Sequence, residues 1–266
     1  MTQTSSIHHS DKRNPWLRLG WVAGLILVLA ATLWGLHGCT ILDSRQSVNL
    51  PAKAVVLSFD DGPSSDTAVT RGLLEVLARH EVRGVFCVIG FQVQKHPEMA
   101  RMIHDAGHLI VNHSFDHDFG ILASPGQIVK SMEATDLALA SSLNAPGYRS
   151  EFYRPPYGWL APQEKVAMAE YGFDDYFPIT TFKLDTFTGP DEAQPLIDEI
   201  LEAARREKGG IFVLHEYRFR DHPASPEEME SATHGANRDW LPGAVDQIIT
   251  TLKKEGFTFP DPESIF

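Results

Sequence analysis

The sequence predicts an α/β fold built mainly from parallel strands. Short apolar runs alternate with longer segments in which apolar residues recur at helical spacing. Polar side chains directly follow several of these runs, as they do at the carboxyl edge of a parallel sheet. The 266 residues, 43% of them hydrophobic, suffice for one domain the size of an α/β barrel or for two small ones. The pattern alone leaves open whether the sheet is open or closed into a barrel.

The first 53 residues differ from this domain. Residues 19–42 carry no charged side chain and are long enough to cross about 30 Å of hydrocarbon as a helix. Basic residues in the preceding stretch, 1–18, predict a cytoplasmic N-terminus with the rest of the chain outside the cytoplasm. Residues 43–53 are then a polar linker to a folded domain of residues 54–266.

Three fates are open for the apolar segment. It is a retained membrane anchor, a cleaved secretory signal, or a lipoprotein signal whose lipidated residue is Cys39. The third follows from the stretch LHGC at Leu36–Cys39, which resembles a bacterial lipobox with an unusual histidine inside it. The second cysteine, Cys87, lies in an apolar run, where we expect it to pack as a small hydrophobic residue rather than to pair with Cys39.

The predicted elements of the domain alternate in type. Strands are expected at 54–59, 84–90, 108–113, around 176–184 and at 210–215. Helices are expected at 66–80, 96–107, 125–143, 162–171, 192–210 and 243–256, with Asp66 or Ser65 as an N-cap and glycine ending the helix at 192–210. Residues 217–240 are polar and aperiodic, which is typical of functional lids or disordered loops.

Polar residues follow the strands at five separate places. Asp60 and Asp61 end the first apolar run, and His113 closes a later one, with His117 four residues on. The other three segments contribute Arg154, Asp185 and His215. Each has an ordinary structural explanation by itself, but their joint placement predicts one site at the carboxyl edge of the sheet.

The two adjacent acids indicate the chemistry of that site. Successive side chains of a strand point to opposite faces, so Asp60 and Asp61 need a turn, which we expect at Gly62-Pro63, to face one cleft. Two close carboxylates then require a cation or a shared proton. A divalent ion bound by one aspartate with His113 and His117 would leave positions open for water and substrate. One acid is thus predicted to hold a metal and its neighbour to handle a proton.

The motifs together resemble a known family. SFDDGP, HSFDH, RPPYG and FVLH, in this order, are similar to those of the polysaccharide deacetylase (NodB-homology) family of carbohydrate esterases. The resemblance covers roughly residues 54–262 and implies a distorted (β/α) barrel. The fourth motif departs from the family, because KLDTFTG lacks the usual tryptophan. The stretch RDW at 238–240 follows His215, and we interpret it as a chance match, unless the long loop folds Trp240 over the cleft.

The resemblance also implies a role for each site residue. It makes Asp60 the catalytic base, held by Arg154, and His215 the general acid, oriented by Asp185. The metal ligands it implies are Asp61, His113 and His117. It further assigns the backbone N–H of Tyr157 to the oxyanion and the side chain of Leu214 to the pocket for the acetyl methyl group.

Together with these residues, the resemblance implies a metal-dependent hydrolase that removes N-acetyl groups from an extracytoplasmic glycan. One divalent ion is expected, zinc or another first-row metal. Peptidoglycan is the first substrate to consider, before chitin-like or other amino-sugar polymers, and the net charge of −12 makes nucleic acid a poor partner. Two alternatives stay open: a membrane-tethered glycan-binding protein with an inactive site, and a hydrolase of another amide such as a cyclic ureide.

Overall fold

The computed structural model describes residues 40–41, 48–118, 120–181, 185–217 and 236–266. The chain divides into two units, Met1–Cys39 and Thr40–Phe266, and every described residue belongs to the second. The predicted apolar segment at 19–42 (except residues 40–41), the lipidation site and most of the predicted loop at 217–240 therefore lie outside the described residues. Within the part that is described, no helix is long and apolar enough to cross a membrane.

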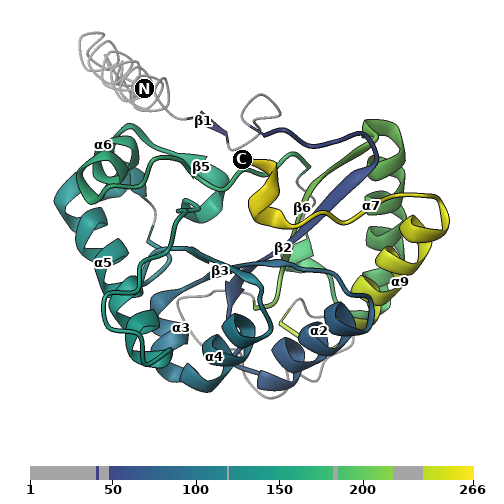
Figure 1. Ribbon diagram of the computed structural model, residues 1–266, viewed down its shortest axis with the longest axis horizontal. Helices are drawn as coiled ribbons and strands as arrows, with labels where there is room; N and C mark the ends of the chain where they lie inside the picture. Colours follow the sequence, from purple (N-terminus) through teal and green to yellow (C-terminus); the bar gives the residue numbers. More distant parts are fainter. Residues whose placement is uncertain (1–39, 42–47, 119, 182–184, 218–235) are drawn as a thin grey trace, which may run out of the picture. The chain divides into compact units, whose positions relative to one another are not determined.

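A parallel sheet forms the centre of the domain. Strand β2 (Ala54–Gly62) pairs with β3 (Val85–Val88) on one side and with β6 (Gly209–His215) on the other. Strand β4 (Leu109–Asn112) pairs with β3, which makes the order β4-β3-β2-β6. Figure 1 labels β3, β2 and β6 at the centre of the domain. The predicted parallel α/β fold is confirmed, because each of these strands coincides with an apolar run of the sequence.

Isolated parallel bridges continue the sheet beyond its two outer strands. They join Asn112 to Tyr153, Tyr153 to Tyr176, and Thr181 to Phe212 of β6. The backbone pairing thus runs from β4 round to β6, consistent with an irregular barrel. The short strands predicted around 176–184 are reduced to these bridges, and residues 182–184 lie outside the described part.

A second, two-stranded sheet corrects one boundary. Strand β1 (Thr40–Ile41) pairs antiparallel with β5 (Trp159–Leu160). The prediction that the apolar helix extends to residue 42 is therefore wrong at its end, because Thr40 and Ile41 are extended and hydrogen-bonded to another strand.

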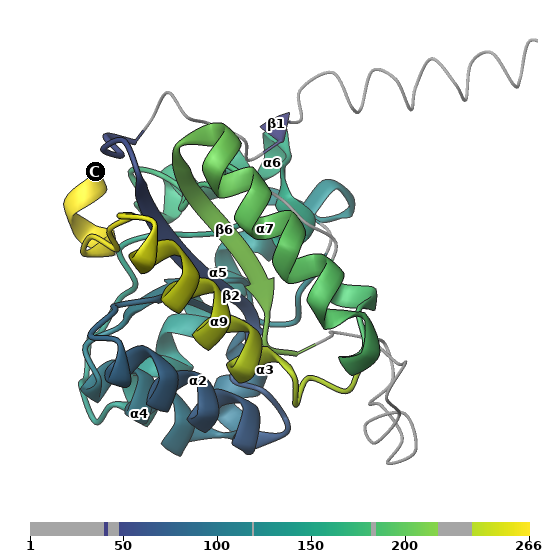
Figure 2. The same ribbon diagram turned by 90° about the vertical axis from the view of Figure 1, so that its right-hand side faces the viewer.

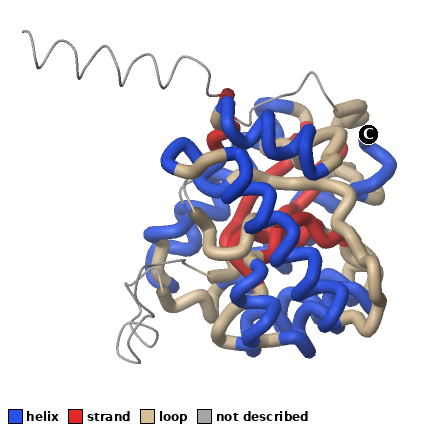
Figure 3. The backbone as a smooth tube through the Cα atoms, turned by 90° about the vertical axis from the view of Figure 1, so that its left-hand side faces the viewer, coloured by secondary structure: helices blue, strands red, loops and turns tan. Residues whose placement is uncertain are grey.

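Helices surround the central strands, as the tube view in Figure 3 shows. They are α2 (Thr67–Arg79), α3 (Gly90–Lys95), α4 (Pro97–Asp105), α5 (Pro125–Ser142), α6 (Pro162–Tyr171), α7 (Ala193–Glu207) and α9 (Leu241–Lys254). Figure 2 shows α7 and α9 beside β6 and β2. Short α3 was not predicted, because its sequence GFQVQK has too few residues to show a helical period.

The helix ends show which capping predictions hold. Asp66 is the N-cap of α2, where its Oδ1 accepts a hydrogen bond of 3.0 Å from the N–H of Ala68. The predicted glycine at the end of α7 is wrong. Lys208 occupies that position with φ of 58°, and Gly209 already belongs to β6. A left-handed lysine ends the helix because the two glycines that follow it are used to start the strand.

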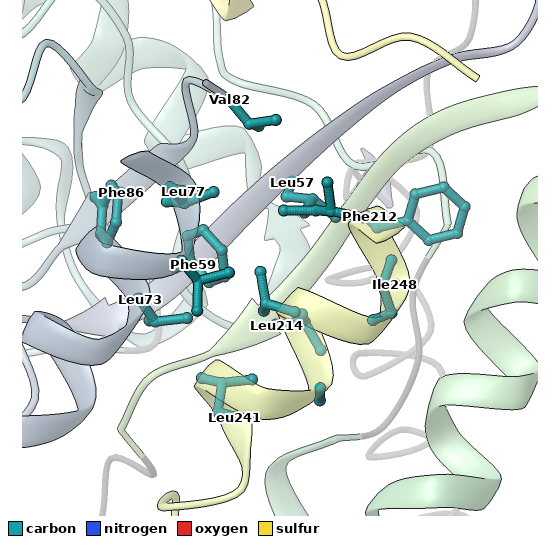
Figure 4. Packing of buried hydrophobic residues seen from close by; sticks show 14 of the residues in the cluster. Leu57, Phe59, Leu73, Leu77, Val82, Phe86, Phe212, Leu214, Leu241 and Ile248 are labelled. Atoms are coloured by element: carbon teal, nitrogen blue, oxygen red, sulfur yellow. The ribbon is translucent and has the colours of Figure 1, made fainter. Parts of the chain in front are cut away.

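The hydrophobic core has one part on each face of the sheet. Because side chains alternate along a strand, Leu57 and Phe59 of β2 face the helices, where they join a large cluster with residues of α2 and α9 (Figure 4). Val56 of β2 faces the other side and packs with Cys87 of β3 and Phe177. Cys87 is fully buried there, which confirms that it packs as a small hydrophobic residue.

Candidate active site

The two adjacent acids are brought to one side by a bulge at the end of β2. Asp60 is paired in register with Cys87, but the next paired residue is Gly62, so that Asp61 is the extra residue. Asp61 has φ of 69°, a left-handed conformation that aspartate adopts more readily than most residues. The turn predicted at Gly62-Pro63 therefore occurs one residue earlier, since the bulge itself breaks the alternation of side chains.

Asp61 lies against two histidines in a buried cluster. Its Oδ1 is 3.4 Å from Nε2 of His113 and 3.2 Å from Nε2 of His117. One ligand atom from each residue lies within 4.8 Å of the others, and no hydrogen-bond donor for Asp61 Oδ1 is found among the described residues. Burial opposes the charged form of Asp61, but the two imidazoles outweigh it and hold the pKa of the carboxyl well below its usual range.

This cluster suits a divalent metal ion. A buried carboxylate oxygen without a donor is costly unless a cation compensates it. One carboxylate and two imidazoles form a donor set that zinc and other first-row ions accept. The Nδ1 of His113 donates to the carbonyl of Arg154 over 2.7 Å, which directs the lone pair of Nε2 toward Asp61.

The backbone that presents these ligands is unusual. His117 has φ of 56° and Ser114 has φ of 63°, both in the left-handed region. The loop that follows β4 is held by a hydrogen bond of 3.1 Å from the N–H of Ser114 to Oδ1 of the buried Asn112. Backbone conformations of this kind persist where the surrounding structure enforces them, and they gather at functional sites.

Asp60 pairs with a fully buried arginine. The guanidinium of Arg154 donates to Oδ1 of Asp60 over 2.5 Å and to Ser58 Oγ over 2.9 Å. Its other nitrogens donate to the carbonyls of Phe177 and Pro178. Burial disfavours the charge of Arg154, but Asp60 outweighs this and raises the pKa of the guanidinium. The arginine thus fixes one oxygen of Asp60 and leaves Oδ2 on the side of His113, at 3.9 Å from its Nε2.

A second acid pairs with a histidine at the end of β6. Asp185 is fully buried in the 3-10 helix Asp185–Phe187, and its Oδ1 lies 2.6 Å from Nδ1 of His215. Its Oδ2 accepts the backbone N–H of His215 over 2.7 Å. Burial lowers the pKa of His215, but the charge of Asp185 more than reverses this, and the pKa is raised to about 9. His215 therefore carries a proton at neutral pH.

Tyr157 lies beside the histidine cluster. Its ring centroid is 4.5 Å from that of His117, and its side chain is half exposed. Tyr157 has φ of 64°, within the 3-10 helix Pro156–Gly158 that follows Arg154. It is thus a third residue of the site, besides Asp61 and His117, with left-handed backbone.

The placement predicted for Leu214 is wrong. Its side chain is fully buried in the core on the helix side of the sheet, near Leu241 and Ile248 in Figure 4. The physical reason is the alternation of side chains, since the residue next to His215 must face the opposite side. The residue on the face of His215 is Val213, two positions earlier and almost fully buried.

Two residues of this region, Arg238 and Glu216, were not predicted from the sequence. Arg238, which we had interpreted as part of a chance match, donates to Oδ2 of Asp185 over 2.5 Å and is buried. Trp240 does not cover the cleft but packs against the large core cluster. The fully buried Glu216 accepts a hydrogen bond of 2.6 Å from Thr70 Oγ1. Nothing in the local sequence marks Arg238, because its partner is 53 residues away. The only sequence signal for Glu216 is its position directly after His215.

The geometry agrees with a comparison against known families. The sequence profile of the family described as polysaccharide deacetylase matches residues 47–175. That range contains the bulged acids, both histidines of the cluster and Arg154. Over this range, just under half of its length, the chain is similar to the polysaccharide deacetylase family. Asp185, His215 and Arg238 lie beyond the matched range, so the second half of the site is defined by the structure.

Relatives within the polysaccharide deacetylase family cover most of the domain. A chitooligosaccharide deacetylase of Bradyrhizobium sp. is 28% identical over 77% of this chain and 87% of that protein. A peptidoglycan-N-acetylglucosamine deacetylase of Listeria monocytogenes is 27% identical over 80% of this chain but only 39% of its own length. The structure of PdaA of Bacillus subtilis, a family 4 carbohydrate esterase, superposes with a TM-score of 0.62 at 25% identity. That superposition covers 84% of this chain and 85% of PdaA.

Proposed function

We propose that this polysaccharide N-deacetylase uses one divalent metal ion to remove N-acetyl groups from amino sugars of an extracytoplasmic glycan. The proposal is supported by the relatives, which are named for deacetylation of chitooligosaccharides and peptidoglycan. It is supported further by the side chains around the Asp61 cluster, which match the needs of amide hydrolysis.

The observation that carries the proposal is the pairing of Asp60 with His215 across the sheet. The two residues are in register on the neighbouring strands β2 and β6, so their side chains leave the sheet side by side on one face. One is a carboxylate fixed by Arg154, and the other is a protonated imidazole fixed by Asp185. A proton acceptor and a proton donor thus lie together near the cluster of Asp61, His113 and His117.

Amide hydrolysis needs both groups. A divalent ion held by Asp61, His113 and His117 would polarise the acetyl carbonyl and lower the pKa of a nearby water. Asp60 accepts a proton from the attacking water, and Arg154 keeps the accepting carboxylate in place. The backbone N–H of Tyr157 would donate to the oxyanion of the tetrahedral intermediate.

The departing amine requires a proton. Because Nδ1 of His215 is bonded to Asp185, its Nε2 is the atom that can donate to the amine nitrogen as the C–N bond breaks. A pKa near 9 keeps this donor protonated at neutral pH before the reaction. The products are acetate and a free amino sugar, and Val213, on the same face as His215, is placed to contact the acetyl methyl group.

The location of the reaction rests on the N-terminal sequence. Residues 19–42, preceded by basic residues, direct the domain across the cytoplasmic membrane, as a retained anchor, as a lipoprotein modified at Cys39, or as a secreted form. Amino-sugar polymers of the envelope are the substrates available there. Peptidoglycan is therefore our first choice of substrate, followed by chitin-like oligomers.

The proposal is tested by acetate release. The purified full-length chain in detergent is incubated with chitooligosaccharides and with isolated peptidoglycan, before and after dialysis against a chelator and after return of zinc, cobalt or manganese. We expect acetate from at least one glycan, lost with the metal and restored by it. Tight glycan binding without acetate in every metal form would contradict the proposal and favour the glycan-binding alternative. Hydrolysis of a cyclic ureide but of no glycan would favour the second alternative, a hydrolase of another amide.

A further inference from the structure

Arg238 binds both members of the Asp185–His215 pair. It lies three residues before α9, with its side chain 2% exposed. One of its nitrogens, Nη2, lies 2.5 Å from Oδ2 of Asp185 and 2.5 Å from the carbonyl oxygen of His215. Its Nη1 donates to the carbonyl oxygen of Asp185 over 2.8 Å, and its Nε donates to that of His215 over 2.9 Å. The guanidinium thus directs its hydrogen bonds to these two residues alone among the described contacts.

These contacts join the ends of two segments that the sheet pairs only earlier in each segment, at Thr181 and Phe212. Asp185 begins a 3-10 helix after the bridge at Thr181, and His215 is the last residue of β6. Bonds to both backbone carbonyls fix the distance between the two segments, and the bond to Oδ2 fixes the rotation of the carboxylate. A planar guanidinium can make these bonds at once, whereas the single ammonium of lysine cannot reproduce the fork.

The charges around the pair give Arg238 a second effect. His215 is faced by the carboxylates of Asp185, from the 3-10 helix, and of Asp60 and Asp61, from β2. Arg238 adds a positive charge on the far side of Asp185 and lowers the pKa of that carboxyl together with His215. Asp185 therefore shares its charge between two cations, which limits how strongly it can hold the proton of His215.

We propose that Arg238 is a positioning residue for the proton donor, which it holds by fixing Asp185 and the end of β6 in one arrangement. This inference rests on the proposed function of His215 as the acid. Arg238 itself does not contact the acetyl group, so it acts through Asp185 and His215. Its counterpart on the other side of the site is Arg154, which holds Asp60 in the same way.

A purely structural role is the alternative to be separated. Arg238 also lies over the ring of Trp240, with its guanidinium carbon 4.8 Å from the ring centroid, and Trp240 packs against the large core cluster. On this alternative, loss of Arg238 lowers the amount of folded protein but leaves the turnover of each folded, metal-loaded molecule unchanged.

The experiment uses four forms of the full-length chain: wild type, Arg238→Lys, Arg238→Gln and Arg238→Ala. The matched control is Arg205→Gln, which removes an exposed arginine in the last turn of α7 that binds both oxygens of Glu255. For each form we measure the metal content, kcat and KM for acetate release per metal-loaded molecule, and the pH dependence of kcat/KM. The pKa of His215 is measured separately in the metal-free chain, from the NMR signals of labelled histidine assigned with His215→Gln.

For Arg238→Gln we expect kcat to fall about 10²-fold with little change in KM, since a small misplacement of a catalytic group has an effect of this size. The pKa of His215 should rise by about half a unit or more, because a positive neighbour has been removed. Arg238→Lys should keep the pKa of His215 near the wild-type value, because the positive charge remains. It should still lose much of kcat, because an ammonium cannot make the several hydrogen bonds of the guanidinium. Addition of guanidinium ion should restore part of the rate in Arg238→Ala.

Several outcomes would overturn the inference. Unchanged kcat per folded molecule together with an unchanged His215 pKa in Arg238→Gln would assign Arg238 a structural role only. If Arg238→Gln does not fold, kcat per folded molecule and the pKa of His215 are measured in Trp240→Leu instead. That variant retains the guanidinium of Arg238 but removes the ring beside it. If the wild type releases no acetate, the proposed function fails, but the NMR titration still shows whether Arg238 controls His215.

Discussion

The two halves of the candidate site are built differently. The metal half, with Asp61, His113 and His117, depends on left-handed backbone at a bulge and in a loop just after β4. The acid half, with Asp185 and His215, depends on hydrogen bonds among segments far apart in the chain, closed by Arg238. Local sequence motifs accompany the first kind of construction. The second kind leaves little local trace, because any of the three residues could occur in an ordinary loop.

The largest expected effect tests the metal half. Replacement of His117 by alanine removes one of three ligands, and we expect bound metal and acetate release to be lost together. Metal content is measured by elemental analysis of the purified variant, with folding followed by circular dichroism. His104→Ala, which changes an exposed histidine, is the matched control and should retain both. Activity that survives in metal-free His117→Ala would contradict the proposed division of the site.

The acid half should respond in the opposite way. In His215→Ala we expect the metal content to stay at the wild-type level while kcat falls roughly 10²–10⁴-fold, the contribution of positioned proton transfer. The same elemental analysis and acetate assay are used. A variant with near-normal turnover would show that His215 is not the sole proton donor.

Arg154 is expected to stabilise the folded chain, because it pairs with the buried Asp60. Its replacement by methionine leaves the buried charge of Asp60 without a partner, and we expect the free energy of unfolding to fall by roughly 3–5 kcal/mol. Arg79→Ala breaks an exposed ion pair with Asp246 and should cost at most about 1 kcal/mol. Urea unfolding at neutral pH measures both. Equal effects of the two variants would show that burial is not what makes the Arg154 pair important.

Asp185 should set the pH range of activity. Asp185→Asn removes the carboxylate that raises the pKa of His215 to about 9, so the pKa should fall toward the ordinary value of 6.5. Because the acid must be protonated, activity is then lost at a lower pH, and the basic limb of the pH profile of kcat/KM moves down. The acidic limb of the profile should stay in place. A basic limb that does not move would separate Asp185 from the control of the proton donor.

Glu216 should give the smallest effect, at the border between the halves. It follows His215, but its carboxyl lies against Gly62, where an added Cβ would approach its Oε1 to 1.5 Å. Burial raises the pKa of Glu216 to about 7, from an ordinary 4.5. The folded chain therefore takes up a proton that the unfolded chain does not hold between these values, and stability falls as the pH rises from about 4.5 to 7.

A neutral isostere should remove that loss. Relative to wild type, Glu216→Gln should gain roughly 2–3 kcal/mol in the free energy of unfolding at pH 8 compared with pH 4. Urea unfolding of both chains at the two pH values isolates this difference, because the other titrating groups are common to both. An identical pH dependence in the two chains would show that Glu216 titrates normally.

The amphipathic and apolar patterns were enough to predict most of the fold. Strands β2, β3, β4 and β6 and the helices α2, α5, α6 and α9 lie where their periodicity places them, because burial of an apolar face outweighs other preferences there. The pattern failed where pairing was minimal, as at Tyr176 and Thr181, and where an element was too short to show a period, as in α3. Closure of the barrel came from those minimal pairings and was open at the sequence level.

Sequence alone determined which side chains gather at the carboxyl edge of the sheet, because the ends of parallel strands meet there whatever the details of packing. Only the tertiary structure decided how they face one another. It placed the break in alternation at Asp61, turned Leu214 into the core, and brought Arg238 onto Asp185 from the start of α9. These features arise from left-handed backbone conformations and from contacts between distant segments. The energies of both depend on neighbours that a local pattern does not specify.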